Sequence, residues 1–263
     1  MRIVVAGATG TLGGHVADAV RAAGHDPVSV SRRSGTDLLS GEGLADLLRN
    51  ASAVIDASST SSISTKGSVR FFSTVTRNLL AAERAAGVPH HVGVSIIGAA
   101  KVPAYYYAGK AAQENILMAE QGGWSLLRTT QFHEFAAQLA ARGKVGPLQI
   151  VPSMRSQPIG AAEVATELVG IALGEPRGLE PDFAGPREES MTDMVRRYLA
   201  ATGQRRPALG ISLPGAWGRG MRDGSILPGP GARFGHQTFE EWLAARAATA
   251  PADRPSRGRG AGA

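Results

Sequence analysis

Three glycines follow the first apolar run of the chain at intervals of three residues. Gly7, Gly10 and Gly13 lie between residues 2–6, which read as a strand, and an amphipathic stretch that reads as a helix. The first glycine permits a tight turn, the second lets backbone approach a ligand, and the third lets the helix pack closely on the strand. Unpaired N–H groups at a helix start bind phosphate. This context predicts a dinucleotide pyrophosphate site rather than a turn without a ligand, made by Gly7, Thr9, Gly10, Thr11, Leu12 and Gly13.

The second apolar run, residues 27–31, ends in polar residues at the place where such sites select their cofactor. An NAD site normally carries Asp or Glu there, which binds the ribose 2′-hydroxyl. This chain has Ser31, Arg32 and Arg33 instead. Two guanidinium groups suit a 2′-phosphate, because they form charge-assisted, fork-shaped hydrogen bonds with phosphate oxygens. We predict that these three residues select NADP; the alternative is that one or both arginines point into water.

His133 follows the fifth apolar run and is a candidate general acid, because an imidazole exchanges protons near neutral pH. A partly buried structural histidine is the alternative. Metal chemistry is not predicted, since the chain has no cysteine and no group of ligands with the spacing of His-Glu-x-x-His. The absence of a Gly-x-Ser-x-Gly motif also argues against an α/β-hydrolase.

These residues are separated by an alternation of short β-rich runs and longer amphipathic stretches. Such alternation is typical of a parallel sheet with helices on both faces. The predicted fold class is therefore α/β, a doubly wound parallel sheet of the Rossmann type. The predicted strands are residues 2–6, 27–31, 53–57, 91–96 and 125–128, and the predicted helices are residues 12–23, 43–48, 69–86, 106–120 and 132–142.

After Gly143 the alternation stops. Shorter elements at 148–151, 161–173, 182–184, 191–201 and 238–247 surround a Gly/Pro-rich stretch at 213–235. We predict an NADP-binding domain of residues 1–158, a smaller lobe of residues 159–248 over the substrate cleft, and a disordered basic tail of residues 249–263. The segment 213–218 is either a lid over the substrate or a surface loop that packs on Trp217.

Further segments occur in the order and at the spacing of a known family. Together with the glycine-rich turn they resemble the atypical and extended short-chain dehydrogenase/reductases, in particular their NmrA-like NAD(P)H-binding branch. The resemblance covers roughly residues 1–250 and is strongest before residue 135. The segments are 36–38 (Thr-Asp-Leu), 56–59 (Asp-Ala-Ser-Ser), 94–98 (Val-Ser-Ile-Ile-Gly), 106–110 (Tyr-Tyr-Ala-Gly-Lys) with Glu114, and 127–132 (Leu-Arg-Thr-Thr-Gln-Phe).

The resemblance implies roles for individual residues. Tyr106 would donate a proton to the substrate, Lys110 would hold the ribose hydroxyls, and Ser95 would fix the substrate carbonyl. Tyr106 and Lys110 are spaced to share one helix face. Tyr107 is the alternative ring in the pocket, and a packed aromatic helix start is the alternative to catalysis. The implied cofactor contacts are Asp37 and Leu38 at the adenine, Ala57, Ser58 and Ser59 along the adenosine, and Gln131 and Phe132 beside the nicotinamide.

The function that this reading predicts is an NADPH-dependent oxidoreductase that reduces a carbonyl, a quinone or an activated C=C bond of a small organic molecule. One alternative is a redox sensor or regulator that binds NADP without turnover. A weaker alternative is an isomerase or epimerase that retains its cofactor and returns the hydride. The Tyr106–Lys110 pair favours an enzyme, because a sensor has no need of a proton donor at this position.

Composition limits the other classes of function. The chain has 263 residues and a formal charge of +6, but residues 1–194 carry 17 basic against 18 acidic side chains. The excess of positive charge lies in residues 195–263, with 11 against 4, and aromatic residues make up only 5% of the chain. We expect no nucleic-acid partner, because neither a basic folded face nor interleaved stacking aromatics are indicated. Without a signal peptide or an apolar run of membrane length, we also expect no membrane contact and a cytoplasmic location. A homodimer is left open.

Overall fold

The computed structural model describes residues 1–249. The predicted basic tail of residues 249–263 lies outside the described residues, apart from residue 249 itself. Within residues 1–249, no helix is both long enough and apolar enough to cross a membrane.

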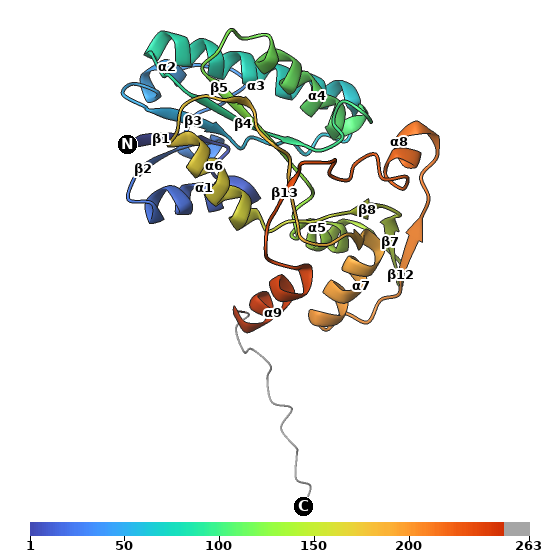
Figure 1. Cartoon of the computed structure of the whole chain (residues 1–263). Helices are drawn as coiled ribbons and strands as arrows, with labels where there is room; N and C mark the ends of the chain where they lie inside the picture. Colours follow the sequence, from blue (N-terminus) through green and yellow to red (C-terminus); the bar gives the residue numbers. More distant parts are fainter. Residues whose placement is uncertain (250–263) are drawn as a thin grey trace, which may run out of the picture.

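A parallel eight-stranded sheet forms the centre of the molecule (Figure 1). Its strand order is β13-β10-β5-β4-β3-β1-β2, and the short strand β9 also pairs with β5. The strands are β1 (Arg2–Ala6), β2 (Asp26–Val30), β3 (Ala53–Asp56), β4 (His91–Ile96), β5 (Trp124–Thr129), β9 (Gly178–Leu179), β10 (Phe183–Ala184) and β13 (Arg233–Phe234).

Helices cover both faces of this sheet, which confirms the predicted doubly wound fold. On one face lie α1 (Thr11–Ala22) and α6 (Ala161–Ala172); on the other lie α2 (Leu44–Leu47), α3 (Thr65–Ala86) and α4 (Tyr105–Met118) (Figure 1). The helix that follows β1 and the helix that follows β3 thus cover opposite faces. Neighbouring strands with this property form a switch point, where α/β proteins bind ligands at the carboxyl ends of the strands.

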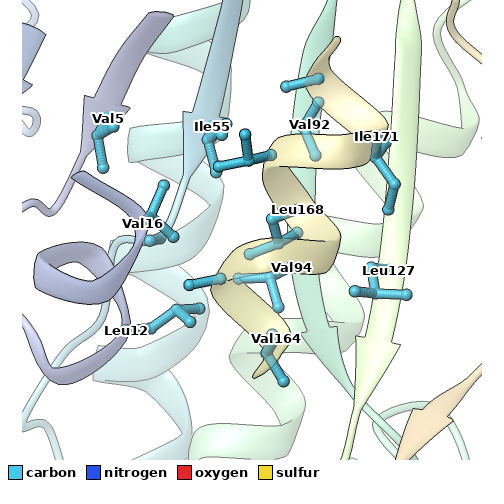
Figure 2. Close-up of a cluster of buried hydrophobic side chains, with 14 of the residues drawn as sticks. Val5, Leu12, Val16, Ile55, Val92, Val94, Leu127, Val164, Leu168 and Ile171 are labelled. Carbon is cyan, nitrogen blue, oxygen red and sulfur yellow. The ribbon is translucent and has the colours of Figure 1, made fainter. Parts of the chain in front are cut away.

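The central strands are continuous apolar runs because both of their faces are buried. In β1, Ile3 and Val5 enter the core beneath α1 and α6, while Val4 and Ala6 enter the core beneath α2 and α3. Figure 2 shows the first of these cores, in which side chains of α1 and α6 meet those of β1, β3, β4 and β5. Polar residues therefore lie mainly in the loops and helices that connect the strands, and the candidate site lies at the carboxyl ends of the strands.

A smaller lobe with its own core lies beside the carboxyl ends of the strands (Figure 1). Its elements are α5 (Phe135–Arg142), β6 (Lys144–Val145), β7 (Leu148–Pro152), β8 (Arg155–Ser156), β11 (Glu189–Ser190), α7 (Met191–Ala201), β12 (Ala208–Ile211), α8 (Gly215–Gly220) and α9 (Phe239–Thr249). Strands β12, β7 and β6 form a three-stranded sheet, and β11 pairs with β8. The sequence did not predict β12 or α8.

The predicted division at residue 158 does not separate the two cores. Helix α6 lies after that position but packs against α1 and the large sheet, and β10 and β13 extend the same sheet. Conversely, Ala136, Ala140 and Val151 precede residue 158 and lie in the core of the lobe. The reason is that one face of the sheet would remain half covered without α6, so the chain returns to it after the lobe has begun.

Two helix starts also differ from the prediction. Helix α3 begins at Thr65 rather than at residue 69, because the Ser64 hydroxyl accepts a hydrogen bond from Gly67 N at 3.0 Å and caps the helix. Helix α5 begins at Phe135 rather than at residue 132, because Phe132 forms a β-bridge with Ile159. Side-chain capping and a tertiary bridge therefore set these two boundaries.

At the amino end of β4, a buried ion pair makes stability depend on pH. His91 Nδ1 lies 2.8 Å from Glu83 Oε1, and both side chains are almost fully buried. Burial alone would lower the pKa of His91, but the adjacent Glu83 carboxylate raises that pKa above its ordinary value. The folded protein therefore keeps this proton to higher pH than the unfolded chain does.

We expect the stabilisation from this pair to be complete below about pH 6.5 and to be lost as pH rises through the folded pKa. The measurement is urea unfolding of the parent and of Glu83→Gln across that window. The parent's excess stability should decline with rising pH, by at most about 1.4 kcal/mol per pH unit for one proton. Burial lowers the pKa of the neighbouring His90, so protonation of His90 reduces the stability of the protein only below about pH 6.5. His90 therefore does not produce a decline in stability with rising pH. An excess that grows with pH would contradict the prediction.

Candidate functional site

The glycine-rich turn lies at the switch point, in direct contact with the loop that follows β3. Gly7 has a φ of +81°, and a Cβ atom there would lie 2.8 Å from both the Ala57 carbonyl oxygen and the Ser58 Cα atom. A Cβ atom on Gly13 would lie 2.2 Å from the Gly7 carbonyl oxygen. Only glycine at these two positions lets the two loops and the start of α1 approach so closely.

The start of α1 is open to an anion. Its N-cap residue is Gly10, so no side chain caps the helix, and its first turn contains no acidic residue. Thr9 and Thr11 are exposed at this end, while Leu12 is buried in the core. Backbone N–H groups of the first turn are consequently free of side-chain partners and suit a pyrophosphate. These residues fit a dinucleotide.

The end of β2 presents two exposed arginines beside this turn. Gly7 N donates a hydrogen bond to Val30 O at 2.9 Å, which fixes the end of β2 against the glycine loop. Ser31 is buried and forms a reciprocal cap with Ser34 over the short helix Arg32–Ser34. Arg32 and Arg33 are exposed, and neither forms an ion pair within residues 1–249. Both guanidinium groups are therefore available to a phosphate.

The residues predicted for the adenine side lie near β2 but differ in their exposure. Asp37 is exposed, and its Oδ1 accepts a hydrogen bond from Leu39 N at 2.9 Å, which leaves one carboxylate oxygen for a ligand. Leu38 is buried in the core beneath α2 and α3, and Asn78 Nδ2 donates to its carbonyl oxygen at 2.9 Å. The Leu38 side chain therefore serves the core.

The loop after β3 places Ser58 and Ser59 at the carboxyl end of that strand. Ser58 N donates to Asp56 Oδ1 at 3.0 Å, and the buried Ser58 hydroxyl has no partner in the described part of the chain. Ser59 is exposed, and its hydroxyl lies 3.4 Å from the Tyr106 hydroxyl. This contact joins the loop after β3 to the start of α4.

The two adjacent tyrosines of α4 point to different parts of the molecule. The Tyr106 ring contacts Phe72 edge-on, with centroids 5.3 Å apart, and its hydroxyl faces Ser59. Tyr107 is buried in the core of the lobe, where its hydroxyl accepts a hydrogen bond from Gln131 Nε2 at 2.6 Å. Burial raises the pKa of Tyr107, so this phenol holds its proton firmly. Of the two rings, Tyr106 is thus the one that contacts the loop after β3.

Lys110 lies one turn after Tyr106 and is only 3% exposed. Its Nζ donates to the Val94 carbonyl oxygen at 2.8 Å and to Gln113 Oε1 at 2.9 Å, and lies 4.2 Å from the centroid of the Phe72 ring. Ser95, the next residue on β4, is also buried, and its hydroxyl has no partner among the described residues. The sequence missed the contributions of Gln113 and Phe72, although the spacing of Gln113 three residues after Lys110 places both on one helix face.

Helix α4 is fixed tightly behind these groups. A Cβ atom on Gly109 would lie 2.5 Å from the Phe72 ring and 2.8 Å from the Ser68 backbone, so α3 and α4 are in close contact. On the other side, Glu114 accepts two hydrogen bonds from Arg128 of β5, at 3.0 and 2.6 Å. The segment around Tyr106 therefore has a rigid support.

The start of α4 also meets the Gly/Pro-rich stretch of the lobe. Tyr105 has a φ of +51°, its N–H donates to Thr65 Oγ1 at 2.9 Å, and its ring contacts Trp217 of α8 with centroids 4.8 Å apart. The segment that was predicted to be a lid or a packed loop thus rests on the residue next to Tyr106.

The three candidates at residues 131–133 all have structural contacts. His133 is fully buried, its Nε2 lies 3.0 Å from Gln237 O, and its ring packs near Phe239 and Trp242 of α9. Burial lowers its pKa and favours the neutral ring, in keeping with the structural histidine that was the alternative to a general acid. The Gln131 amide is occupied at both ends, by the Tyr107 hydroxyl and by the Ser156 hydroxyl. Phe132 packs against the core beneath α1 and α6.

Across the described residues, no three His, Asp or Glu side chains are grouped so that they could hold a metal ion. The candidate site combines the start of α1, which no side chain caps, with the exposed Arg32 and Arg33, with Tyr106 and with the buried Lys110. We call the start of α1 and the glycine-rich turn the anion cradle.

No protein-family model matches the chain, and no curated protein matches its sequence. Solved structures match its fold. A UDP-glucose 4-epimerase from Thermus thermophilus, solved with NAD, gives a TM-score of 0.67 at 18% identity, over 94% of this chain and 93% of that one. An NADPH-dependent quinone oxidoreductase from Escherichia coli, solved with NADPH, gives 0.69 at 16% identity, over 93% and 99%. An NAD-dependent NDP-hexosamine 5,6-dehydratase of tunicamycin biosynthesis gives 0.67 at 19% identity, over 94% and 96%.

These likenesses confirm the fold that the sequence motifs implied. The chain has a Rossmann fold, a doubly wound parallel sheet, and it matches these structures over nearly their whole length.

Proposed function

We propose that this protein is an NADPH-dependent oxidoreductase that reduces a carbonyl, a quinone or an activated C=C bond of a small organic molecule. The observation that carries the proposal is the placement of Tyr106 and Lys110. The Tyr106 hydroxyl lies against Ser59, on the loop that contacts the glycine-rich turn, and Lys110 lies behind its ring. A proton donor beside a dinucleotide cradle is what a reductase requires and a sensor does not.

The residues present fit the cofactor. The start of α1 would hold the pyrophosphate, Arg32 and Arg33 the 2′-phosphate, and Lys110 the nicotinamide ribose. A bound nicotinamide supplies the hydride. The solved quinone oxidoreductase with NADPH and the solved epimerase with NAD support a nicotinamide cofactor, and the two arginines favour NADP.

The chain itself would supply the proton and its placement. Tyr106 donates the proton from its hydroxyl to the substrate atom that gains electron density. The Lys110 ammonium lies 5.9 Å from the centroid of the Tyr106 ring. The unpartnered Ser95 hydroxyl is the proposed anchor for the substrate oxygen. Tyr107, buried in the lobe, takes no part.

The test is to incubate the protein with NADPH and each member of a panel of quinones, ketones and enones, and to measure turnover as the loss of NADPH absorbance. Turnover of one class identifies the reaction. Binding of NADPH by calorimetry without turnover of any compound would contradict the proposal and favour a sensor that binds NADP.

A second candidate follows from the epimerase and the dehydratase among the matching structures. An isomerase or epimerase would use the same cradle and the same Tyr106–Lys110 pair, but it would return the hydride to its substrate. Nucleotide sugars incubated with the protein would then change without net consumption of NADPH. Product analysis by NMR separates this outcome from reduction.

Cofactor selection gives a direct prediction. Arg32→Ala combined with Arg33→Ala should weaken NADPH binding by about 10- to 100-fold, because charged hydrogen bonds to the 2′-phosphate are lost. NADH has no 2′-phosphate, so its affinity should stay nearly unchanged. Isothermal calorimetry with both cofactors provides the comparison. Tighter binding of NADH than of NADPH by the parent would show that the arginines do not select the cofactor.

A further inference from the structure

A continuous chain of buried hydrogen bonds crosses from β3 to β4 behind Tyr106. Asp56, the last residue of β3, accepts from Gln113 Nε2 through its Oδ2 at 2.8 Å. Gln113 Oε1 accepts from Lys110 Nζ at 2.9 Å, and Lys110 Nζ donates in turn to the Val94 carbonyl oxygen of β4 at 2.8 Å. Asp56 and Gln113 are fully buried and Lys110 is 3% exposed.

Burial of a carboxylate and an ammonium is unfavourable unless each charge is compensated. The Asp56 carboxylate accepts N–H groups from Ser58 and Gln113. The Lys110 ammonium has two oxygen acceptors and the face of the Phe72 ring at 4.2 Å. Among residues 1–249, no carboxylate touches Lys110 directly. The two charges are therefore linked only through the Gln113 amide.

The orientation of that amide suits both charges. Its oxygen faces the ammonium and its NH2 group faces the carboxylate. A dipole aligned in this way stabilises a cation at one end and an anion at the other, in surroundings where water does not screen them. The Asp56 charge thus stabilises the Lys110 ammonium through the Gln113 amide, without a direct ion pair between the two residues.

We infer that Gln113 and Asp56 are positioning residues that hold the Lys110 ammonium at the end of β4 with one N–H left for the cofactor ribose. An ammonium has three N–H donors, and Val94 and Gln113 occupy two of them. This inference rests on the proposed function, because the third N–H has a purpose only if a dinucleotide binds in the cradle beside it.

The first test measures how the ammonium is held and needs no cofactor. The chain has four lysines; Lys66, Lys101 and Lys144 are exposed, whereas Lys110 is buried. In protein labelled with nitrogen-15 lysine, the Lys110 ammonium protons should exchange with water at least about tenfold more slowly than those of the other three. Gln113→Leu should remove most of that difference. Asn115→Leu, an exposed amide on the same helix, should leave it unchanged.

The second test compares two ligands in the same variants. NADPH contains the nicotinamide ribose, and adenosine 2′,5′-bisphosphate lacks it. Gln113→Leu should weaken NADPH by about 10- to 100-fold, the loss expected for a charged hydrogen bond, and should leave the bisphosphate within about threefold of the parent. The double variant Asp56→Asn with Gln113→Glu exchanges the acid and the amide; the hydrogen bond between the two residues reverses its direction, and Lys110 and Ser58 keep their acceptors. It should restore both slow exchange and NADPH binding.

Unchanged exchange and unchanged NADPH affinity in Gln113→Leu would overturn the inference. Equal weakening of both ligands would overturn it as well, because it would mean a general loss of structure. Should the parent bind neither ligand, the proposed function fails together with the ribose contact. The exchange comparison, made without ligand, would still decide whether Gln113 holds the ammonium.

Discussion

Turnover is expected to fall by about 100- to 10,000-fold when Tyr106 is replaced by phenylalanine, because general acid catalysis contributes about this much. The variant keeps the ring and its contact with Phe72 and removes one hydroxyl. NADPH affinity should therefore stay within a few-fold of the parent. Steady-state kinetics on the substrate found in the panel, with calorimetry for the cofactor, separates the two effects.

Tyr107→Phe is the matched control. It removes a hydroxyl from the adjacent residue, where that hydroxyl bonds to Gln131 inside the lobe. We expect a loss of about 0.5–1.5 kcal/mol in the free energy of unfolding and little change in turnover. If Tyr107→Phe were the inactive variant and Tyr106→Phe the active one, the proton donor would be misassigned by one residue.

Gly13→Ala is expected to be destabilising by about 1–3 kcal/mol, the usual effect of overpacking. The new Cβ atom would lie 2.2 Å from the Gly7 carbonyl oxygen and 2.8 Å from the Ala8 Cα atom, so backbone has to move. The movement displaces the pyrophosphate cradle, and NADPH affinity should fall with stability. Thermal unfolding with and without NADPH measures both.

Gly14→Ala is the control at the next residue of the same helix. There the nearest atom to the new Cβ is the Ala8 carbonyl oxygen at 3.8 Å, an ordinary contact. Alanine in place of glycine inside a helix is stabilising by about 0.5–1 kcal/mol, so this variant should unfold at a higher temperature than the parent. Equal behaviour of the two variants would show that close approach at Gly13 is not required.

The features that can be predicted from the sequence are those that residues close together in the chain determine. The turn at Gly7 and the first five strands needed only glycine spacing and apolar runs, and β1 and β4 have the predicted bounds. For Tyr106 and Lys110, helical spacing and a family motif agree in predicting a site, and the structure places both residues on α4.

The remaining features depend on parts of the chain that meet only after folding. His133 packs against α9, about a hundred residues later, so the sequence around it does not show which residues cover it. The Gln131 amide likewise forms hydrogen bonds with residues distant in the sequence, Tyr107 and Ser156. The edge strand β13 has two residues, too few to give a periodic signal.

The path of the chain between its two cores bears on how such a protein can diversify. The chain leaves the large sheet for α5, returns with α6 and β10, leaves again for α7, and returns once more with β13. A single genetic crossover therefore cannot exchange the lobe for another, because any one cut would also remove strands or a helix from the half that contains the large sheet. Substitutions and changes of loop length within the lobe avoid that loss.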